Sequence, residues 1–142
     1  TRHDAILIVE DSKADARLIE RTLKRVRICG TLQFVRDGQQ AIDFLSECGN
    51  RKPNESGIPV LILLDLKLPR RDGFEVLEWT RQQSTLKGIP VIVVTSSSLS
   101  LDVERARDLN ADAYLVKPVE EESLIEVLRK LDLFWLVGQE GR

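Results

Sequence analysis

Five short aliphatic runs, each followed by a longer segment of helical periodicity, constrain the fold of this chain more than any other feature. The aliphatic runs span residues 5–9, 31–35, 60–64, 91–95 and 113–116. The segments with helical spacing of apolar residues follow them at 12–26, 37–47, 72–83, 101–109 and 120–131. This alternation is typical of strand and helix units that assemble into a parallel sheet.

The near-continuous aliphatic character of the runs predicts a sheet that is covered by helices on both faces. For five such units the common doubly wound strand order is 2-1-3-4-5, in which ligands bind beyond the carboxyl ends of strands 1 and 3. The chain has 142 residues, of which 42% are hydrophobic, enough for one domain with a substantial core. We expect a single domain over 1–142, with its core at about 5–131 and an apolar extension at 132–142.

Polar residues follow the predicted strands at the edge where ligands are expected. Glu10 and Asp11 follow the first run, Asp65 follows the third, Thr95 ends the fourth, and Lys117 follows the fifth. Three carboxylates so close repel each other unless a cation compensates them. Because oxygen ligands without cysteine or histidine favour a hard cation, the pattern predicts Mg²⁺.

The same residues suit a phosphoryl group. Lys117 supplies a positive charge for a phosphate oxygen, and Thr95 supplies a hydroxyl donor. An aspartate can act as a nucleophile and form an acyl phosphate when a metal ion neutralises the incoming charge. Asp65 is therefore the candidate attachment point.

Four ordered motifs resemble those of the receiver domain of two-component response regulators. They are "VED" (9–11), "DLKLPRRDG" (65–73), "VTSS" (94–97) and "AYLVKP" (113–118), and they stand in the family's order and at its spacing. The resemblance covers about residues 5–130. It implies a doubly wound, flavodoxin-like (βα)5 fold and a signalling protein of a two-component phosphorelay, not a conventional enzyme.

The resemblance also implies roles for individual residues. Asp65 would accept a phosphoryl group from a phosphohistidine of a sensor histidine kinase, and the domain itself would catalyse its phosphorylation and dephosphorylation. Glu10 and Asp11 would hold Mg²⁺ together with Asp65 and the backbone carbonyl of Lys67. Mn²⁺ or another divalent cation could substitute for it.

Further residues would form a switch in the family. Thr95 and Lys117 would bind the phosphoryl oxygens, and the peptide bond between Lys117 and Pro118 would be cis. Thr95 would move toward the phosphoryl group, and Tyr114 would turn into the space it leaves. The surface formed by the helix at 101–109, the strand at 113–116 and the helix at 120–131 would change shape as a result.

The apolar extension at 132–142 leaves two interpretations open. Its leucines, phenylalanine, tryptophan and valine favour a homodimer interface with the helices at 101–109 and 120–131, or they cap the end of the chain's own core. The "FWL" sequence at 134–136 and the long polar loop at 48–59 also resemble small stand-alone regulators that are paired with phytochrome-type kinases.

Composition excludes several classes of partner and catalyst. With 21 Lys and Arg against 23 Asp and Glu, the net charge of −2 gives no reason to expect nucleic acid or a membrane surface as a partner. No run is long and apolar enough for a membrane span, so we expect a soluble, cytoplasmic protein. His3 is the only histidine, which leaves a Ser/His/Asp arrangement without a plausible base. Cys29 and Cys48 are expected to be buried free thiols.

Short stretches of the sequence argue against two other functional classes of protein with a similar predicted fold. A haloacid-dehalogenase-like phosphatase would need an aspartate two residues after the nucleophile, where Lys67 stands. A flavin carrier would need a phosphate-binding loop after the first strand, where the chain has "EDSKAD" at 10–15. A pseudo-receiver that binds proteins without phosphorylation remains the alternative.

Overall fold

The computed structural model describes residues 4–49 and 58–138 and contains the expected five-stranded parallel sheet, in the order β2-β1-β3-β4-β5. The strands are β1 (Ala5–Val9), β2 (Thr31–Val35), β3 (Pro59–Leu64), β4 (Val91–Thr95) and β5 (Ala113–Val116). The helices are α1 (Lys13–Arg25), α2 (Gly38–Gly49), α3 (Gly73–Gln82), α4 (Ser100–Asp108), α5 (Glu121–Lys130) and the short 3-10 helix η1 (Phe134–Leu136). Most of the expected loop at 48–59, and His3, lie outside the described residues. None of the described helices is long and apolar enough to cross a membrane.

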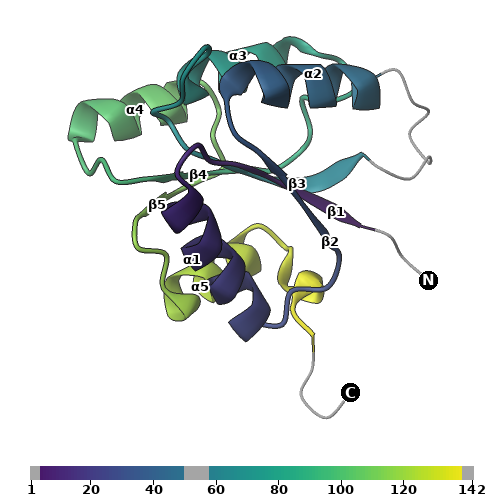
Figure 1. Ribbon diagram of the computed structural model, residues 1–142, viewed down its shortest axis with the longest axis vertical. Coiled ribbons are helices and arrows are strands. Elements are labelled where there is room, and N and C mark those ends of the chain that lie inside the picture. The colour runs from purple at the N-terminus through teal and green to yellow at the C-terminus, as the bar shows by residue number, and fades with distance from the viewer. Residues whose placement is uncertain (1–3, 50–57, 139–142) are drawn as a thin grey trace.

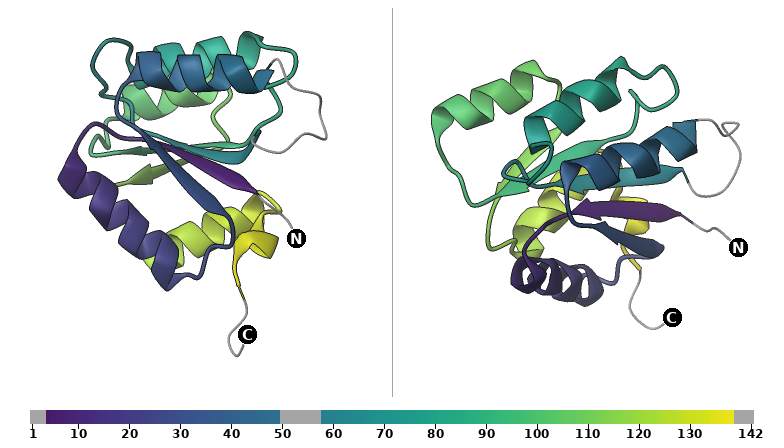
Figure 2. Two further views of the ribbon diagram at one scale, coloured as in Figure 1. Left: turned by 45° about the vertical axis from the view of Figure 1, so that its right-hand side comes forward. Right: turned by 45° about the horizontal axis from the view of Figure 1, so that its top comes forward.

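Helices cover both faces of the sheet, as the aliphatic runs predict. Helices α1 and α5 pack on one face, and α2, α3 and α4 lie on the other (Figures 1 and 2). Alternate residues of β1 point to the two faces, with Ile6 and Ile8 in the cluster beneath α1 and α5, and Leu7 and Val9 in the opposite cluster. Strand β2 differs, because it is an edge strand and none of its five residues is buried.

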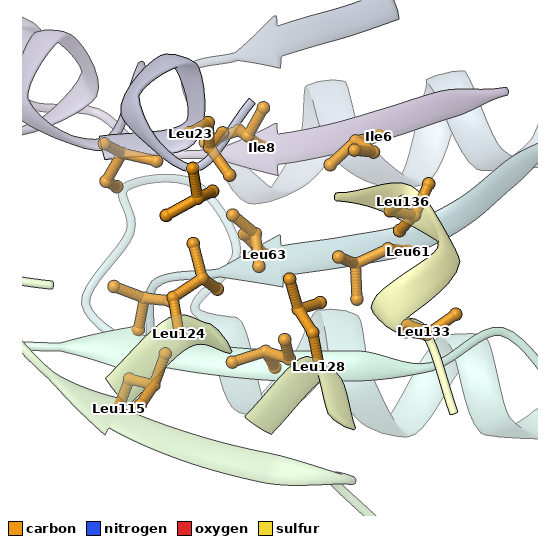
Figure 3. Packing of buried hydrophobic residues seen from close by; sticks show 14 residues of the cluster. Ile6, Ile8, Leu23, Leu61, Leu63, Leu115, Leu124, Leu128, Leu133 and Leu136 are labelled. Carbon is orange, nitrogen blue, oxygen red and sulfur yellow. The ribbon is translucent and has the colours of Figure 1, made fainter. Parts of the chain in front are cut away.

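The hydrophobic core beneath α1 and α5 continues past the expected boundary near residue 131. Figure 3 shows Leu133 and Leu136 beside Leu61 and Leu128, and both are buried, with exposed fractions of 6% and 0%. Burying a leucine side chain contributes about 1.5–3 kcal/mol to stability. The capping interpretation of the C-terminal residues therefore holds for these two leucines.

The backbone attaches η1 to the segment between α1 and β2. The Cys29 N–H donates to the Leu136 carbonyl over 2.7 Å, and the Gly138 N–H donates to the Arg27 carbonyl over 2.7 Å. Cys29 is exposed, so the expectation of two buried thiols was wrong for it, whereas Cys48 is buried. Cys29 lies at the surface because it precedes an edge strand.

Arg81 of α3 fixes the segments that lead into β4 and β5, and no sequence motif indicated it. Its guanidinium donates to the carbonyl oxygens of Lys87, Ile89 and Asn110 over 2.7–3.1 Å. It also pairs with Asp112 at 2.8 Å. Because charge-assisted hydrogen bonds are roughly twice as strong as neutral ones, this network holds the starts of both strands in place.

Candidate functional site

The candidate site lies at the carboxyl edge of the sheet, where the residues that follow the strands remain in the backbone hydrogen-bond ladder. The Asp65 N–H donates to the Val9 carbonyl over 3.1 Å, and the Lys117 N–H donates to the Thr95 carbonyl over 2.8 Å. The Glu10 N–H makes an equivalent 3.0 Å bond to β2. The core therefore holds the backbone beneath each side chain of the site.

The ammonium group of Lys117 is the centre of the site. Its Nζ lies 2.5 Å from Glu10 Oε1, 2.9 Å from Asp15 Oδ2 and 3.1 Å from Asp65 Oδ2. Glu10 and Asp65 were predicted to belong to the site, but Asp15 was missed. Its position in the first turn of α1, five residues after Glu10, was the only signal for it in the sequence.

The donor atoms present fit a divalent cation. Glu10, Asp11 and Asp65 can each offer one carboxylate oxygen, all within 4.8 Å of one another. Within the described residues, the buried Glu10 Oε1 has no polar partner apart from the lysine ammonium. Three carboxylates, those of Glu10, Asp15 and Asp65, contact one lysine, and Asp11 lies beside Glu10 and Asp65, so the site carries excess negative charge. Hard oxygen donors with that charge suit Mg²⁺ or a similar ion.

Burial and charge shift two pKa values in the site. Burial raises the pKa of Glu10 from 4.5 to about 7, although its contact with Lys117 acts in the opposite direction. Burial also opposes the charge of Lys117, but its contacts with Glu10, Asp15 and Asp65 outweigh it and raise the lysine pKa above its ordinary value. Lys117 therefore remains positively charged, and its single charge does not balance the carboxylates that contact it.

We predict that the stability of the metal-free protein falls as pH rises from 4.5 to about 7, the window set by the pKa of Glu10 in the unfolded and folded chain. In this window the folded protein retains a proton that the unfolded chain has lost, so deprotonation favours unfolding. A Glu10→Gln variant should show a shallower decline, and Mg²⁺ should flatten the decline of the wild type. Urea unfolding with a chelator would measure both. Equal pH slopes in the wild type and the variant would contradict the assignment to Glu10.

Thr95 and Tyr114 are connected through Ser97, which stands two residues after Thr95 in the "VTSS" motif. The Ser97 N–H donates to Thr95 Oγ1 over 3.4 Å, and the Tyr114 hydroxyl donates to the Ser97 carbonyl over 2.8 Å. The Ser97 hydroxyl in turn donates to Asp102 of α4 over 2.6 Å. These hydrogen bonds connect Thr95 to Tyr114 and to the first turn of α4.

The loop between β3 and α3 is held close to the site by two glycines. The Gly73 N–H donates to the Leu66 carbonyl over 2.7 Å, and the Gly38 N–H donates to the Pro69 carbonyl over 3.3 Å. Within this loop, the N–H of Lys67 donates to Asp65 Oδ1 over 3.3 Å. At the other side of the site, the peptide bond between Lys117 and Pro118 is cis.

Comparisons with known proteins agree on one family. The model of the response regulator receiver domain matches residues 6–129. The chain is 43% identical to response regulator Rcp1 of Synechocystis sp., over 92% of this chain and 88% of that protein. A solved structure of the Mn²⁺-bound form of Rcp1 is similar with a TM-score of 0.73 and 41% identity, covering 94% of each chain.

Two further solved structures are similar over nearly the whole chain. Bacteriophytochrome response regulator RtBRR has a TM-score of 0.83 and 40% identity, covering 99% of this chain and 85% of that one. The phosphorylated cyanobacterial phytochrome response regulator RcpA has a TM-score of 0.75 and 36% identity, covering 95% of each chain.

Proposed function

Because this chain belongs to the response regulator receiver domains, signalling proteins of two-component systems, we propose that it accepts a phosphoryl group on Asp65 and switches a binding surface. The observation that carries this proposal is the contact of one lysine ammonium, on a side chain only 13% exposed, with both Glu10 and Asp65. We further propose that residues 1–142 contain a single receiver domain. The family match over 6–129 supports this, and the core extends to Leu136.

Phosphoryl transfer at Asp65 would come from a phosphohistidine. The N–P bond breaks, a carboxylate oxygen of Asp65 forms the new O–P bond, and the imidazole leaves. Lys117 contacts Oδ2 of Asp65, and the Lys67 N–H contacts Oδ1. The first contact brings positive charge to the point where the phosphoryl oxygens arrive.

Mg²⁺ is the proposed cofactor, held by Glu10, Asp11, Asp65 and the Lys67 carbonyl. When bound, it would reduce the repulsion between the carboxylates and the incoming phosphoryl group. The three clustered carboxylates and the Mn²⁺-bound structure of the relative Rcp1 support a divalent cation. The all-oxygen donor set supports the choice of Mg²⁺.

The output of the proposed switch is the surface formed by α4, β5 and α5. Thr95 would donate its hydroxyl to a phosphoryl oxygen, and Tyr114 would follow through Ser97. Three apolar side chains of this surface are exposed to solvent. They are Leu99, which precedes α4, Leu101 of α4 and Val116 of β5, with exposed fractions of 66%, 77% and 44%. A partner that prefers one shape of this surface would shift the equilibrium by its difference in affinity.

The proposed partner is a sensor histidine kinase of the phytochrome type. The relatives RtBRR and RcpA are described as a bacteriophytochrome and a phytochrome response regulator. That RcpA has been solved in its phosphorylated form supports phosphorylation as the input signal for this chain.

Incubation with acetyl phosphate and Mg²⁺, followed by intact mass measurement, tests the proposal. The chain should gain the mass of one phosphoryl group, and a chelator should suppress the gain. The adduct should then disappear with time, because the proposed domain also catalyses its own dephosphorylation. The assay needs no kinase, so it tests the chemistry of the site independently of the proposed partner.

We also propose a homodimer through α4, α5 and the C-terminal residues. Phe134 and Trp135 support it, because 41% and 45% of their surfaces remain exposed after Leu133 and Leu136 are buried. Replacing both aromatic residues with glutamine should lower the sedimentation coefficient if they form the interface, and the two core leucines stay unchanged. Identical sedimentation of the wild type and the double variant would contradict this interface.

A further inference from the structure

Asp15 differs from the other two carboxylates that contact Lys117. Glu10 and Asp65 follow strands and are buried, with side-chain exposures of 1% and 8%. Asp15 comes from the first turn of α1, and its side chain is 37% exposed. The Ser12 hydroxyl accepts a 3.2 Å hydrogen bond from the Asp15 N–H, which fixes this turn and places the carboxylate beside the lysine.

Two of the three N–H donors of the lysine ammonium are in hydrogen bonds to carboxylates, Asp15 Oδ2 at 2.9 Å and Asp65 Oδ2 at 3.1 Å. Glu10 Oε1 forms an ion pair with the same ammonium group, without hydrogen-bond geometry. A phosphoryl group on Asp65 would bring oxygens that also need a donor from Lys117. Releasing Glu10 would leave its buried Oε1 without a polar partner among the described side chains, whereas the half-exposed Asp15 can be hydrated when it is released.

Asp15 also borders the space next to the lysine. A hollow of about 280 Å³ is lined by residues of α1, the β4–α4 segment and the β5–α5 segment. They are Asp15, Leu18, Ile19, Ser96, Lys117, Pro118 and Val119. A carboxylate at this position acts on the lysine from the solvent side, while Glu10 and Asp65 hold it from the sheet.

We infer that Asp15 is a positioning residue that competes with the incoming phosphoryl group for Lys117 and thereby slows phosphorylation of Asp65. The inference rests on the proposed function, and it assigns to Asp15 a role beyond stabilising the start of α1. In the unphosphorylated protein, the Asp15 carboxylate accepts a hydrogen bond from one N–H of Lys117. When a phosphoryl group is transferred to Asp65, Lys117 breaks this hydrogen bond and donates the same N–H to a phosphoryl oxygen.

An Asp15→Asn variant tests this inference, because it keeps the size of the side chain and removes its charge. We expect the phosphorylation rate with acetyl phosphate and Mg²⁺ to rise at least about threefold, since the neutral amide is a weaker competitor for the ammonium group. The increase should appear in the maximal rate at saturating acetyl phosphate. An Asp15→Glu variant retains the carboxylate and should return the rate toward that of the wild type.

Glu20→Gln is the matched control, because Glu20 lies on the same helix and pairs with Lys24 at 3.4 Å, not with Lys117. Its rate should equal that of the wild type. An unchanged or lower rate in Asp15→Asn, or an equal increase in Glu20→Gln, would overturn the inference while a wild-type adduct leaves the proposed function standing. A wild-type chain that gains no phosphoryl group would overturn both.

Discussion

An Asp65→Asn variant is expected to gain no phosphoryl group from acetyl phosphate under conditions in which the wild type gains one. The amide has nearly the shape of the carboxylate, and its oxygen can still accept a hydrogen bond from Lys117, which lies 3.1 Å from Asp65 Oδ2. It lacks the anionic oxygen that attacks phosphorus, so the chemical step is lost while the site keeps its shape. Intact mass measurement should find the variant entirely unmodified.

A surface exchange of the same type serves as the control for this variant. Asp108→Asn, at the exposed end of α4, should be phosphorylated like the wild type. A phosphoryl adduct that persists in Asp65→Asn would contradict Asp65 as the acceptor. If the wild type also remains unmodified with Mg²⁺ present, the result would favour a pseudo-receiver that binds its partner without phosphorylation.

A Gly73→Ala variant should destabilise the protein by about 3 kcal/mol or more, the second large effect that we expect. A Cβ at Gly73 would overlap the carbonyl oxygen of Asp65 and stand 2.6 Å from the Cα of Leu66. Both neighbours are backbone atoms of Asp65 and Leu66, and the Gly73 N–H is hydrogen-bonded to the Leu66 carbonyl. The clash can therefore be relieved only by moving the loop that carries Asp65.

Urea unfolding measures this loss, and Gly88→Ala is its matched control. A Cβ at Gly88 would meet no atom within 4 Å, so this variant should keep or slightly increase the free energy of unfolding. Where Gly73→Ala remains folded, it should also be phosphorylated more slowly than the wild type. Equal stability of the two alanine variants would show that the loop can move away from position 73 at little cost.

The sheet and most of the site could be predicted from local sequence patterns. Aliphatic runs of strand length alternate with amphipathic segments, and this alternation indicates the strand order through the known topology of such units. Because the carboxyl ends of parallel strands meet at one edge, Glu10, Asp65 and Lys117 could be expected to converge although up to 107 positions separate them. The structure places these three side chains in direct contact.

Other features depend on packing between elements that no local pattern encodes. The sequence left open whether Leu133 and Leu136 form a dimer surface or cap the core, and the structure shows that they close the core, because η1 folds back against β1 and β3. The role of Arg81 depends on carbonyl groups that point toward it from two other segments. The contacts of η1 and of Arg81 depend on the direction that the chain takes after a turn. Hydrophobic periodicity does not specify that direction.

The sequence by itself determined which strand ends carry the polar side chains of the candidate site, since strand-end residues occupy positions that the parallel topology sets in advance. Only the tertiary structure decided that Lys117 contacts Asp15 as well as Glu10 and Asp65. Asp15 lies on a helix, and the direction of its side chain depends on how α1 packs against the sheet. The path of the β3–α3 loop likewise placed the Asp65 carbonyl against Gly73, where only a missing Cβ leaves room for it.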